Sequence, residues 1–202
     1  MASPSDRLIL ASASSVRARL LRQAGIDFVV QPAEIDEAAI KRRLRGEGRS
    51  PRDCAYALAA AKAAQVSTQN RQAIVIGADQ ILVCADEWFD KPADITAARR
   101  QLLALRGQRH VLETAACALR AGERLWASAS APQLVMRDFT DSFLDDYLAR
   151  EGDAILGSVG AYRLEGRGVQ LFEQIDGDYF AILGLPLVAL LDFLTEAGQL
   201  AR

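Results

Sequence analysis

The stretch whose residues could most clearly carry out chemistry is residues 74–83, where a carboxyl group interrupts an otherwise apolar run. The run is rich in Ile and Val, which is typical of a strand buried on both faces of a sheet. Gly77, Asp79 and Gln80 stand in its middle. A buried carboxylate is costly unless it is paired, hydrogen-bonded or bound to a metal ion. Asp79 is therefore either a structural residue at a strand bend, or a general base or metal ligand in a cleft.

Three cations elsewhere in the chain could act with this carboxylate. Residues 12–15 are small and mostly Ser, and they join a short apolar strand to a helical pattern that carries Arg17 in its first turn. Such a helix start can bind an anion, although an ordinary capped helix has the same pattern. Lys62 follows Leu58 by four residues, so it lies near a buried helix face and either reaches solvent or points into a cleft. Lys91 precedes a proline, which favours an extended backbone there.

An acidic cluster, Glu34, Asp36 and Glu37, follows the second predicted strand. Three carboxylates within four residues repel one another, so they are either solvated or held by a cation. Mg²⁺ and Mn²⁺ prefer oxygen ligands of this kind. The same cluster also suits a helix N-terminus, where acidic side chains complement the helix dipole.

The composition narrows the class of protein. With 24 Lys and Arg against 26 Asp and Glu, the net charge is −2, and no basic surface for nucleic acid is expected. Cys54, Cys84 and Cys117 have no CxxC spacing, which argues against a zinc site and for a reducing compartment. The single His110 excludes a multi-His metal site and disfavours a His-assisted nucleophile. Residues 1–6 are polar and no apolar stretch reaches a membrane span, so we expect a cytoplasmic protein.

The order of the predicted elements indicates a single α/β domain over residues 1–202. The periodic patterns and turn signals predict strands at residues 7–11, 27–32, 74–83, 109–119 and 125–136, and helices at residues 16–24, 51–66, 94–105, 141–150 and 187–196. A turn at residues 121–123 predicts a hairpin of the last two strands. A second hairpin is predicted for residues 169–175 and 179–183. The glycine-rich residues 157–168 match neither a P-loop nor a dinucleotide-binding fingerprint.

Taken together, the cations and carboxylates point to polyphosphate chemistry. Cations and a metal ion neutralise phosphate charge, and one carboxylate can activate water. Because a partner for a Ser or Cys nucleophile is lacking, direct attack by water is favoured over a covalent intermediate.

Several segments, in this order, resemble motifs of the Maf family of nucleoside triphosphate pyrophosphatases: LILASASSVRARLL, EIDE, LAAAKA, VIGADQ, DKP, GAYRLEGRG and GDYFAILGLPL. The resemblance runs from about residue 8 to residue 198. It implies an elongated, twisted mixed sheet flanked by helices, with two lobes and a cleft between them, as in inosine-triphosphatase-like folds. It also implies hydrolysis of a nucleoside triphosphate to the monophosphate and pyrophosphate with Mg²⁺ or Mn²⁺, and a homodimer.

The resemblance also implies a role for particular residues. Asp79 falls on the position of the proton acceptor for the attacking water. Substrate and phosphate binding fall on Ser14, Arg17, Lys62 and Lys91, and metal binding falls on Glu37 and Asp79.

Three positions that distinguish the branches of the family are Val16, Gln80 and Glu165 here. Gln80 and Glu165 resemble the branch that acts on 7-methyl-GTP, whereas the dTTP/UTP branch has Thr and Gln. A carboxylate at residue 165 can accept two N–H bonds from a guanine edge and suits a cationic methylated purine. Val16 departs from both branches, and Asp90 replaces the usual Gly before Lys91. The alternatives are a dTTP/UTP pyrophosphatase and a non-catalytic nucleotide-binding regulator of cell division.

Overall fold

A computed structural model describes residues 7–200, so the polar segment 1–6 lies outside it. Within residues 7–200 the chain forms a mixed sheet of eight strands in which β2, β1, β3, β5, β7 and β8 are neighbours in that order. In addition, β4 pairs with β3 and β6 pairs with β5. The strands are β1 (Leu8–Leu10), β2 (Val29–Val30), β3 (Ile74–Cys84), β4 (Glu87–Phe89), β5 (Arg109–Arg120), β6 (Glu123–Ser130), β7 (Gln133–Met136) and β8 (Phe172–Asp176).

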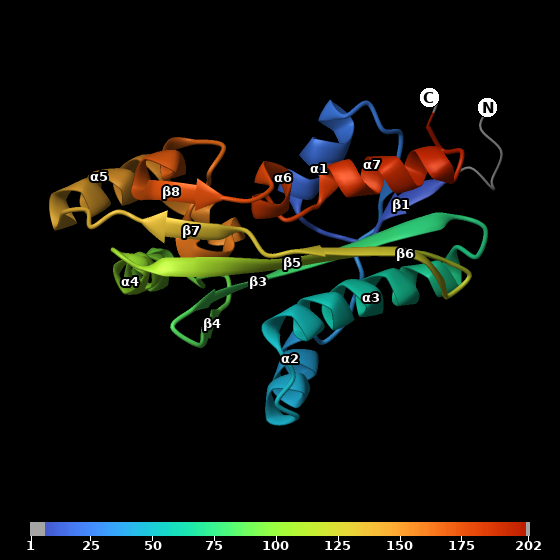
Figure 1. The fold of residues 1–202 in the computed structure, drawn as a ribbon, viewed down its shortest axis with the longest axis horizontal. Helices are drawn as coiled ribbons and strands as arrows, with labels where there is room; N and C mark the ends of the chain where they lie inside the picture. Colours follow the sequence, from blue (N-terminus) through green and yellow to red (C-terminus); the bar gives the residue numbers. More distant parts are fainter. Residues whose placement is uncertain (1–6, 201–202) are drawn as a thin grey trace. The chain divides into compact units, whose positions relative to one another are not determined.

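The predicted α/β class, with a mixed sheet flanked by helices, is confirmed (Figure 1). Strand β1 pairs in parallel with β2 and β3, and the pairs β3–β4, β5–β6, β5–β7 and β7–β8 are antiparallel. The α-helices are α1 (Ser15–Gln23), α2 (Glu37–Gly46), α3 (Pro51–Gln69), α4 (Ile95–Leu105), α5 (Asp141–Glu151), α6 (Tyr179–Ile182) and α7 (Leu187–Glu196). Short 3₁₀ helices are η2 (Gly152–Gly157), η3 (Val159–Ala161) and η4 (Arg167–Leu171). No described helix is long and apolar enough to cross a membrane.

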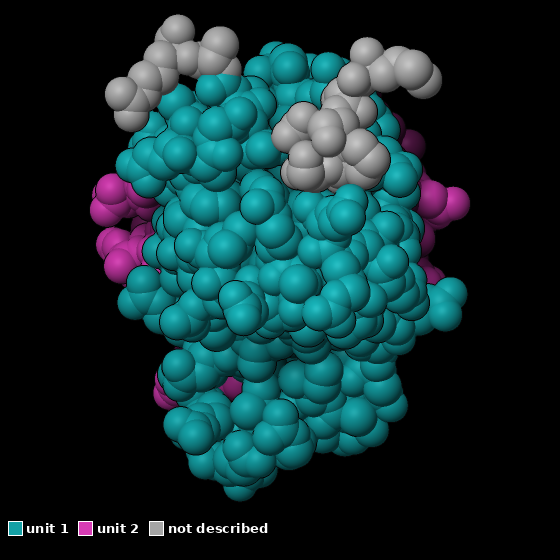
Figure 2. Space-filling model, turned by 90° about the vertical axis from the view of Figure 1, so that its right-hand side faces the viewer, with its two compact units in different colours: residues 1–80, 114–130, 178–202 teal, residues 81–113, 131–177 magenta. Residues whose placement is uncertain are grey.

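The chain divides into two compact units, which Figure 2 colours teal and magenta. The first unit contains residues 1–80, 114–130 and 178–202, and the second contains residues 81–113 and 131–177. The long strands β3 and β5 each contribute one part to each unit.

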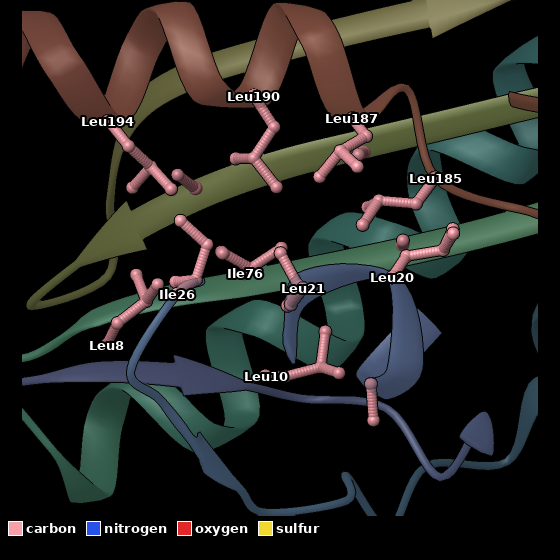
Figure 3. Packing of buried hydrophobic residues seen from close by; sticks show 14 of the residues in the cluster. Leu8, Leu10, Leu20, Leu21, Ile26, Ile76, Leu185, Leu187, Leu190 and Leu194 are labelled. Atoms are coloured by element: carbon pink, nitrogen blue, oxygen red, sulfur yellow. The ribbon is translucent and has the colours of Figure 1, made fainter. Parts of the chain in front are cut away.

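The core of the first unit is built on the alternation of side chains along its strands. Ile74 and Ile76 of β3 face one layer and pack with the buried leucines of α1 and α7. Val75 faces the opposite layer, where it packs with the small residues of α3. Figure 3 shows the first layer, in which side chains from β1, β3, α1 and α7 point toward one another. Figure 1 shows α3 on the opposite face of the strands from α1 and α7. The predicted strand buried on both faces is therefore confirmed.

Side-chain caps begin the helices of this unit where the sequence predicts. Ser14 caps α1 by accepting from the backbone N–H of Arg17. Ser50 caps α3 in the same way, and Pro51 occupies the first turn, where its missing N–H costs nothing. Asp36 caps α2 by accepting from the N–H of Ala39.

In the second unit, α4 packs against α5 and against the 3₁₀ helices η2 and η3. Ala98, Leu102 and Leu105 are completely buried along one stripe of α4, as the spacing predicts. His110 is buried in the same unit, with its Nε2 atom 2.9 Å from the Oη atom of Tyr162. The ring of Phe172 packs edge-on against Tyr162, with ring centroids 4.8 Å apart.

The predicted hairpin of residues 169–175 and 179–183 is wrong. The Asp-Gly turn is present, since Gly177 has φ +118°, but the chain then enters α6. Asp178 starts this helix because its side chain accepts from the N–H of Phe180. Strand β8 pairs with β7 instead. It contains residues 172–175 of the first predicted arm, and residues 169–171 belong to η4.

The predicted strand over residues 125–136 is two strands, β6 and β7, both paired with β5. The break falls at residues 131–132, and Pro132 has no N–H to continue a ladder. Its carbonyl oxygen instead accepts from the N–H of Leu112 at 3.0 Å. The strand predicted at residues 27–32 is also shorter than expected, because only Val29–Val30 is paired.

Candidate active site

The alternation of β3 places Asp79 and Gln80 on opposite faces of the sheet. Asp79 follows Val75 and Gly77 by even steps, so its side chain faces α3. Gln80 follows Ile76 by four residues and faces the layer that also contains α6. Two neighbouring residues of one motif therefore make entirely different contacts.

Asp79 and Glu37 both bind the ammonium group of Lys62. The Nζ atom of Lys62 lies 2.6 Å from Oδ1 of Asp79 and 2.8 Å from Oε1 of Glu37. The side chains of Lys62 and Asp79 are only 10% and 9% exposed, whereas that of Glu37 is 46% exposed. Lys62 therefore does not extend to solvent; it points from α3 onto the central strand. A buried charge pair of this kind is tolerated because each partner is hydrogen-bonded.

Gly77 permits this close approach of α3 to β3. A Cβ atom at residue 77 would lie 2.1 Å from the carbonyl oxygen of Ala59, far inside contact distance. Ala59 lies three residues before Lys62 on α3, so the same close approach places Lys62 over Asp79. The ion pair of Lys62 with Asp79 therefore requires a glycine at residue 77.

Arg17 is buried and bound on several sides. Its Nε atom donates to the carbonyl oxygen of Gly184 at 2.7 Å. Its Nη1 atom donates to the carbonyl oxygen of Ala78 at 2.9 Å and to Oγ of Ser12 at 3.2 Å. Burial lowers the pKa of Arg17 below its ordinary value, and the carboxylates of Asp79 and Glu37 oppose that shift. Arg17 therefore adds positive charge near Asp79 and ties α1 to the backbone one residue before it.

Gln80 is held by its amide group. Its Nε2 atom donates to Oγ1 of Thr114 at 2.8 Å and to the carbonyl oxygens of Ala181 and Ile182 at 2.9 and 3.1 Å. Thr114 is buried and its hydroxyl donates to Ala181 at 3.0 Å. The residue after the central Asp thus fixes the short helix α6.

The remaining predicted site residues belong to α1 and to the second unit. Val16 is half-buried in the first turn of α1, next to Arg17. Lys91 and Glu165 belong to the second unit. Lys91 is exposed, whereas the side chain of Glu165 is 15% exposed and lies 3.7 Å from Nε of Arg163.

Of the acidic cluster, the described structure brings only Glu37 to Lys62. Asp36 is the helix cap already described, and the Glu34 backbone exchanges two hydrogen bonds with the side chain of Gln65, each 2.7 Å long. The interpretation of the cluster as a helix N-terminus is therefore confirmed for Asp36.

The donor set of Asp79 and Glu37 suits a hard divalent ion. Their carboxylates converge on one point, and carboxylate oxygen is the ligand type that Mg²⁺ and Mn²⁺ prefer. No group of three or more His, Cys, Asp or Glu side chains is placed to hold a metal ion within residues 7–200. Mg²⁺ in particular is commonly held by one or two carboxylates together with substrate phosphates and water. The two carboxylates therefore fit an ion that completes its coordination with substrate oxygens.

Comparison with known proteins identifies the family of this chain. Residues 7–197 match the family model described as Maf-like protein. The chain belongs to the Maf-like family.

Curated relatives of this Maf-like chain have closely related names. A protein of Paramagnetospirillum magneticum named nucleoside triphosphate pyrophosphatase is 53% identical over 95% of this chain and 99% of its own length. A Brucella abortus protein named 7-methyl-GTP pyrophosphatase is 50% identical over 92% of this chain and 93% of its own. A Mesorhizobium japonicum protein with that second name is 46% identical over 96% of this chain and 98% of its own.

Three residues with prominent contacts in this Maf-like site were not singled out in the sequence. Ser12 and Gly184 both bind Arg17, and Thr114 binds Gln80. Gly184 has φ +95°, and a Cβ added there would lie 3.2 Å from the guanidinium of Arg17. The absence of a side chain at Gly184 therefore lets Arg17 reach the carbonyl oxygen of this residue. The serine-rich turn before Arg17 is a sequence signal that could identify Ser12. Nothing in the sequence around Thr114 distinguishes that residue.

Proposed function

We propose that this chain hydrolyses the bond between the α- and β-phosphates of a modified nucleoside triphosphate such as 7-methyl-GTP, releasing the monophosphate and pyrophosphate. The observation that carries the proposal is the buried Asp79–Lys62–Glu37 group, with Arg17 beside it. It joins a carboxylate that can act as a base to cations that can bind phosphate.

Family membership supports the general reaction independently of this geometry. Relatives about 50% identical over more than nine-tenths of this chain have the name nucleoside triphosphate pyrophosphatase. The chain is therefore an enzyme of the nucleoside triphosphate pyrophosphatase class, and the preference for a methylated base is the finer part of the proposal.

In the mechanism we propose, Asp79 is the general base. A water molecule attacks the α-phosphorus in line with the bond to the bridging oxygen and transfers a proton to the Asp79 carboxylate. The new bond joins the water oxygen to phosphorus, and the bond to the bridging oxygen breaks, so pyrophosphate leaves with the electron pair. Before the nucleotide binds, Lys62 is hydrogen-bonded to Asp79 and keeps its carboxylate oriented.

Cationic side chains stabilise the charge that moves onto the leaving pyrophosphate. Lys62, Lys91 and Arg17 donate to phosphate oxygens, and the hydroxyl of Ser14 adds a further donor at the start of α1. Glu37 and Asp79 would hold Mg²⁺ or Mn²⁺, and a bound divalent ion supplies Lewis-acid stabilisation of phosphate oxygens.

The proposed preference for 7-methyl-GTP rests on Glu165 and Gln80. A carboxylate at residue 165 accepts hydrogen bonds from guanine N–H groups and favours the positive charge of the methylated ring. The name 7-methyl-GTP pyrophosphatase for some relatives supports the same base. Val16 lacks the Arg or aromatic side chain that both branches of the family usually have at this position, so we propose that the base is selected mainly by the other two residues.

A dTTP/UTP pyrophosphatase and a non-catalytic nucleotide sensor are the alternatives. A panel of GTP, 7-methyl-GTP, dTTP, UTP and ATP, each assayed for pyrophosphate release with Mg²⁺ or Mn²⁺, separates them. We expect 7-methyl-GTP to give the highest kcat/KM. Preference for dTTP and UTP would contradict the proposed base, and binding without pyrophosphate release would contradict the reaction itself.

A further inference from the structure

The point on which the carboxylates of Asp79 and Glu37 converge is occupied by the ammonium group of Lys62. The ammonium group of Lys62 lies within 2.8 Å of one oxygen of each carboxylate. Its side chain is 10% exposed, so the positive charge is neutralised by these two groups and only slightly by solvent. A divalent ion that used the same oxygens would need the position that Nζ holds.

We propose that Lys62 is a place-holding cation that keeps divalent metal off Asp79 and Glu37 until a triphosphate is bound. The proposal rests on the proposed function and adds an order of events to it. Metal binds weakly to the free protein, and metal and triphosphate strengthen each other's binding.

The reason is the cost of moving Lys62. Displacing it from Asp79 would leave a buried ammonium group without an anion, which is strongly unfavourable. A triphosphate supplies a new anion for Nζ, so the lysine can release the two carboxylates when the nucleotide binds. The bound triphosphate thus removes the cost of leaving the Lys62 ammonium group unpaired, which opposes metal binding to the free protein.

The two carboxylates differ in a way that makes such a transfer feasible. Asp79 is fixed in the central strand and its side chain is 9% exposed. Glu37 stands in the first turn of α2 and is 46% exposed, so it can change rotamer at little cost. Glu37 can therefore turn from Lys62 to an arriving ion while Asp79 stays in place.

Mn²⁺ binding measured by electron paramagnetic resonance tests the proposal without reference to turnover. The ligand that replaces substrate is the α,β-methylene analogue of GTP, which resists cleavage at the bond concerned. For the wild-type protein we expect weak binding of Mn²⁺ alone, and a dissociation constant lowered roughly 5- to 150-fold by the analogue, the range of typical coupled sites. The contribution of Mn²⁺ bound to the analogue in solution is subtracted with a protein-free titration.

Variants of Lys62 separate its charge from its packing. Lys62→Met removes the cation and keeps most of the volume, so Mn²⁺ alone should bind at least about tenfold more tightly, and the analogue should strengthen that binding less than it does in the wild type. Lys62→Arg keeps a cation and should retain weak binding. If Lys62→Met fails to fold by circular dichroism, Lys62→Gln is used for the same comparison.

Arg43→Met is the matched control. It removes one positive charge from α2, the helix of Glu37, but Arg43 is exposed and pairs with Glu47 at 3.0 Å. Its Mn²⁺ affinity should equal that of the wild type.

Equal Mn²⁺ affinity in wild type and the neutral Lys62 variants would overturn the proposal, as would tight binding to wild type without the analogue. Loss of the proposed function has a different signature, since it appears as absent pyrophosphate release by wild type in the nucleotide panel, whatever the metal affinities are.

Discussion

At the scale of single residues, burial decides which charged groups can do chemistry. Asp79 and Lys62 are both withdrawn from solvent and paired with each other, whereas most ion pairs on the described surface join exposed side chains. Exposed pairs contribute little because water and salt screen them. A buried pair with a third, movable partner such as Glu37 can instead be rearranged by an anionic ligand.

His110 supports a first prediction, about pH and stability. Burial lowers its pKa to about 4 from the ordinary 6.5, with a smaller opposing effect from the backbone of Gln108. Between those two values the unfolded chain binds the proton and the folded chain does not, so stability falls as the pH falls through this window. Between pH 7.5 and pH 5 this group should remove about 2 kcal/mol from the free energy of unfolding.

Urea unfolding at the two pH values measures this loss, and His110→Gln is the comparison because its side chain does not titrate. The pH-dependent loss should be smaller in that variant by the amount stated. The single histidine also gives an unambiguous NMR signal. A ring that titrates near pH 6.5 in the folded protein would contradict the prediction.

At the scale of elements, the short distance between α3 and β3 determines the geometry of the site. It brings Lys62 onto Asp79, and it is set by the absence of a side chain at residue 77. On the opposite face, Gln80 and Arg17 hold the backbone of residues 181–184. The central motif is thus fixed from both sides of the sheet.

Gly77→Ala is a second prediction. The added Cβ would meet the carbonyl oxygen of Ala59 at 2.1 Å, so α3 has to move away from β3. We expect a loss of roughly 3 kcal/mol in the free energy of unfolding, which is large for one methyl group. Activity should fall as well, because Lys62 moves with the helix.

Gly46→Ala is the control for this change, since a Cβ there meets no atom within 4 Å and the residue ends α2. Denaturant unfolding monitored by circular dichroism compares the two. Equal stability of the two variants would show that the helix does not need its close approach.

The sequence predicts the elements better than the contacts between them. The apolar run around Asp79 predicts a strand buried on both faces, and the four-residue step from Leu58 places Lys62 near a buried face. Neither pattern says which helix covers which face of β3, so the pairing of Lys62 with Asp79 follows only from the topology. The sequence does not predict α6 because the Asp-Gly turn is common to hairpins. The cap by Asp178 begins this helix, and bonds from Gln80 and Thr114, which follow from the fold, hold it.

At the scale of the whole molecule, the residues to which the proposed function gives a role are far apart in the chain. Asp79, Lys62 and Arg17 belong to the first unit, while Lys91 and Glu165 belong to the second. Motifs over nearly the whole chain are therefore needed to recognise this family, and the family model accordingly spans residues 7–197. The homodimer implied by the sequence stays a prediction, which sedimentation velocity would test.

Glu165→Gln is a third prediction, about the choice of nucleotide. Gln keeps the size of the side chain but removes the negative charge that suits a cationic base. We expect kcat/KM for 7-methyl-GTP to fall about tenfold or more relative to GTP, as for loss of a hydrogen bond to a charged group. Glu173→Gln, on the exposed side of β8, should leave the ratio unchanged. An unaltered ratio in Glu165→Gln would show that residue 165 does not read the base.

The most direct test of the central claim is the turnover of Asp79→Asn. The amide has the shape of the carboxylate and cannot accept a proton from water, so pyrophosphate release should fall by roughly 10²- to 10⁴-fold, the range of general-base catalysis. The circular dichroism spectrum should stay that of the wild type, and the exposed-site control Asp27→Asn should keep full activity. Release of pyrophosphate by folded Asp79→Asn at the wild-type rate would contradict the assignment of Asp79 as the base.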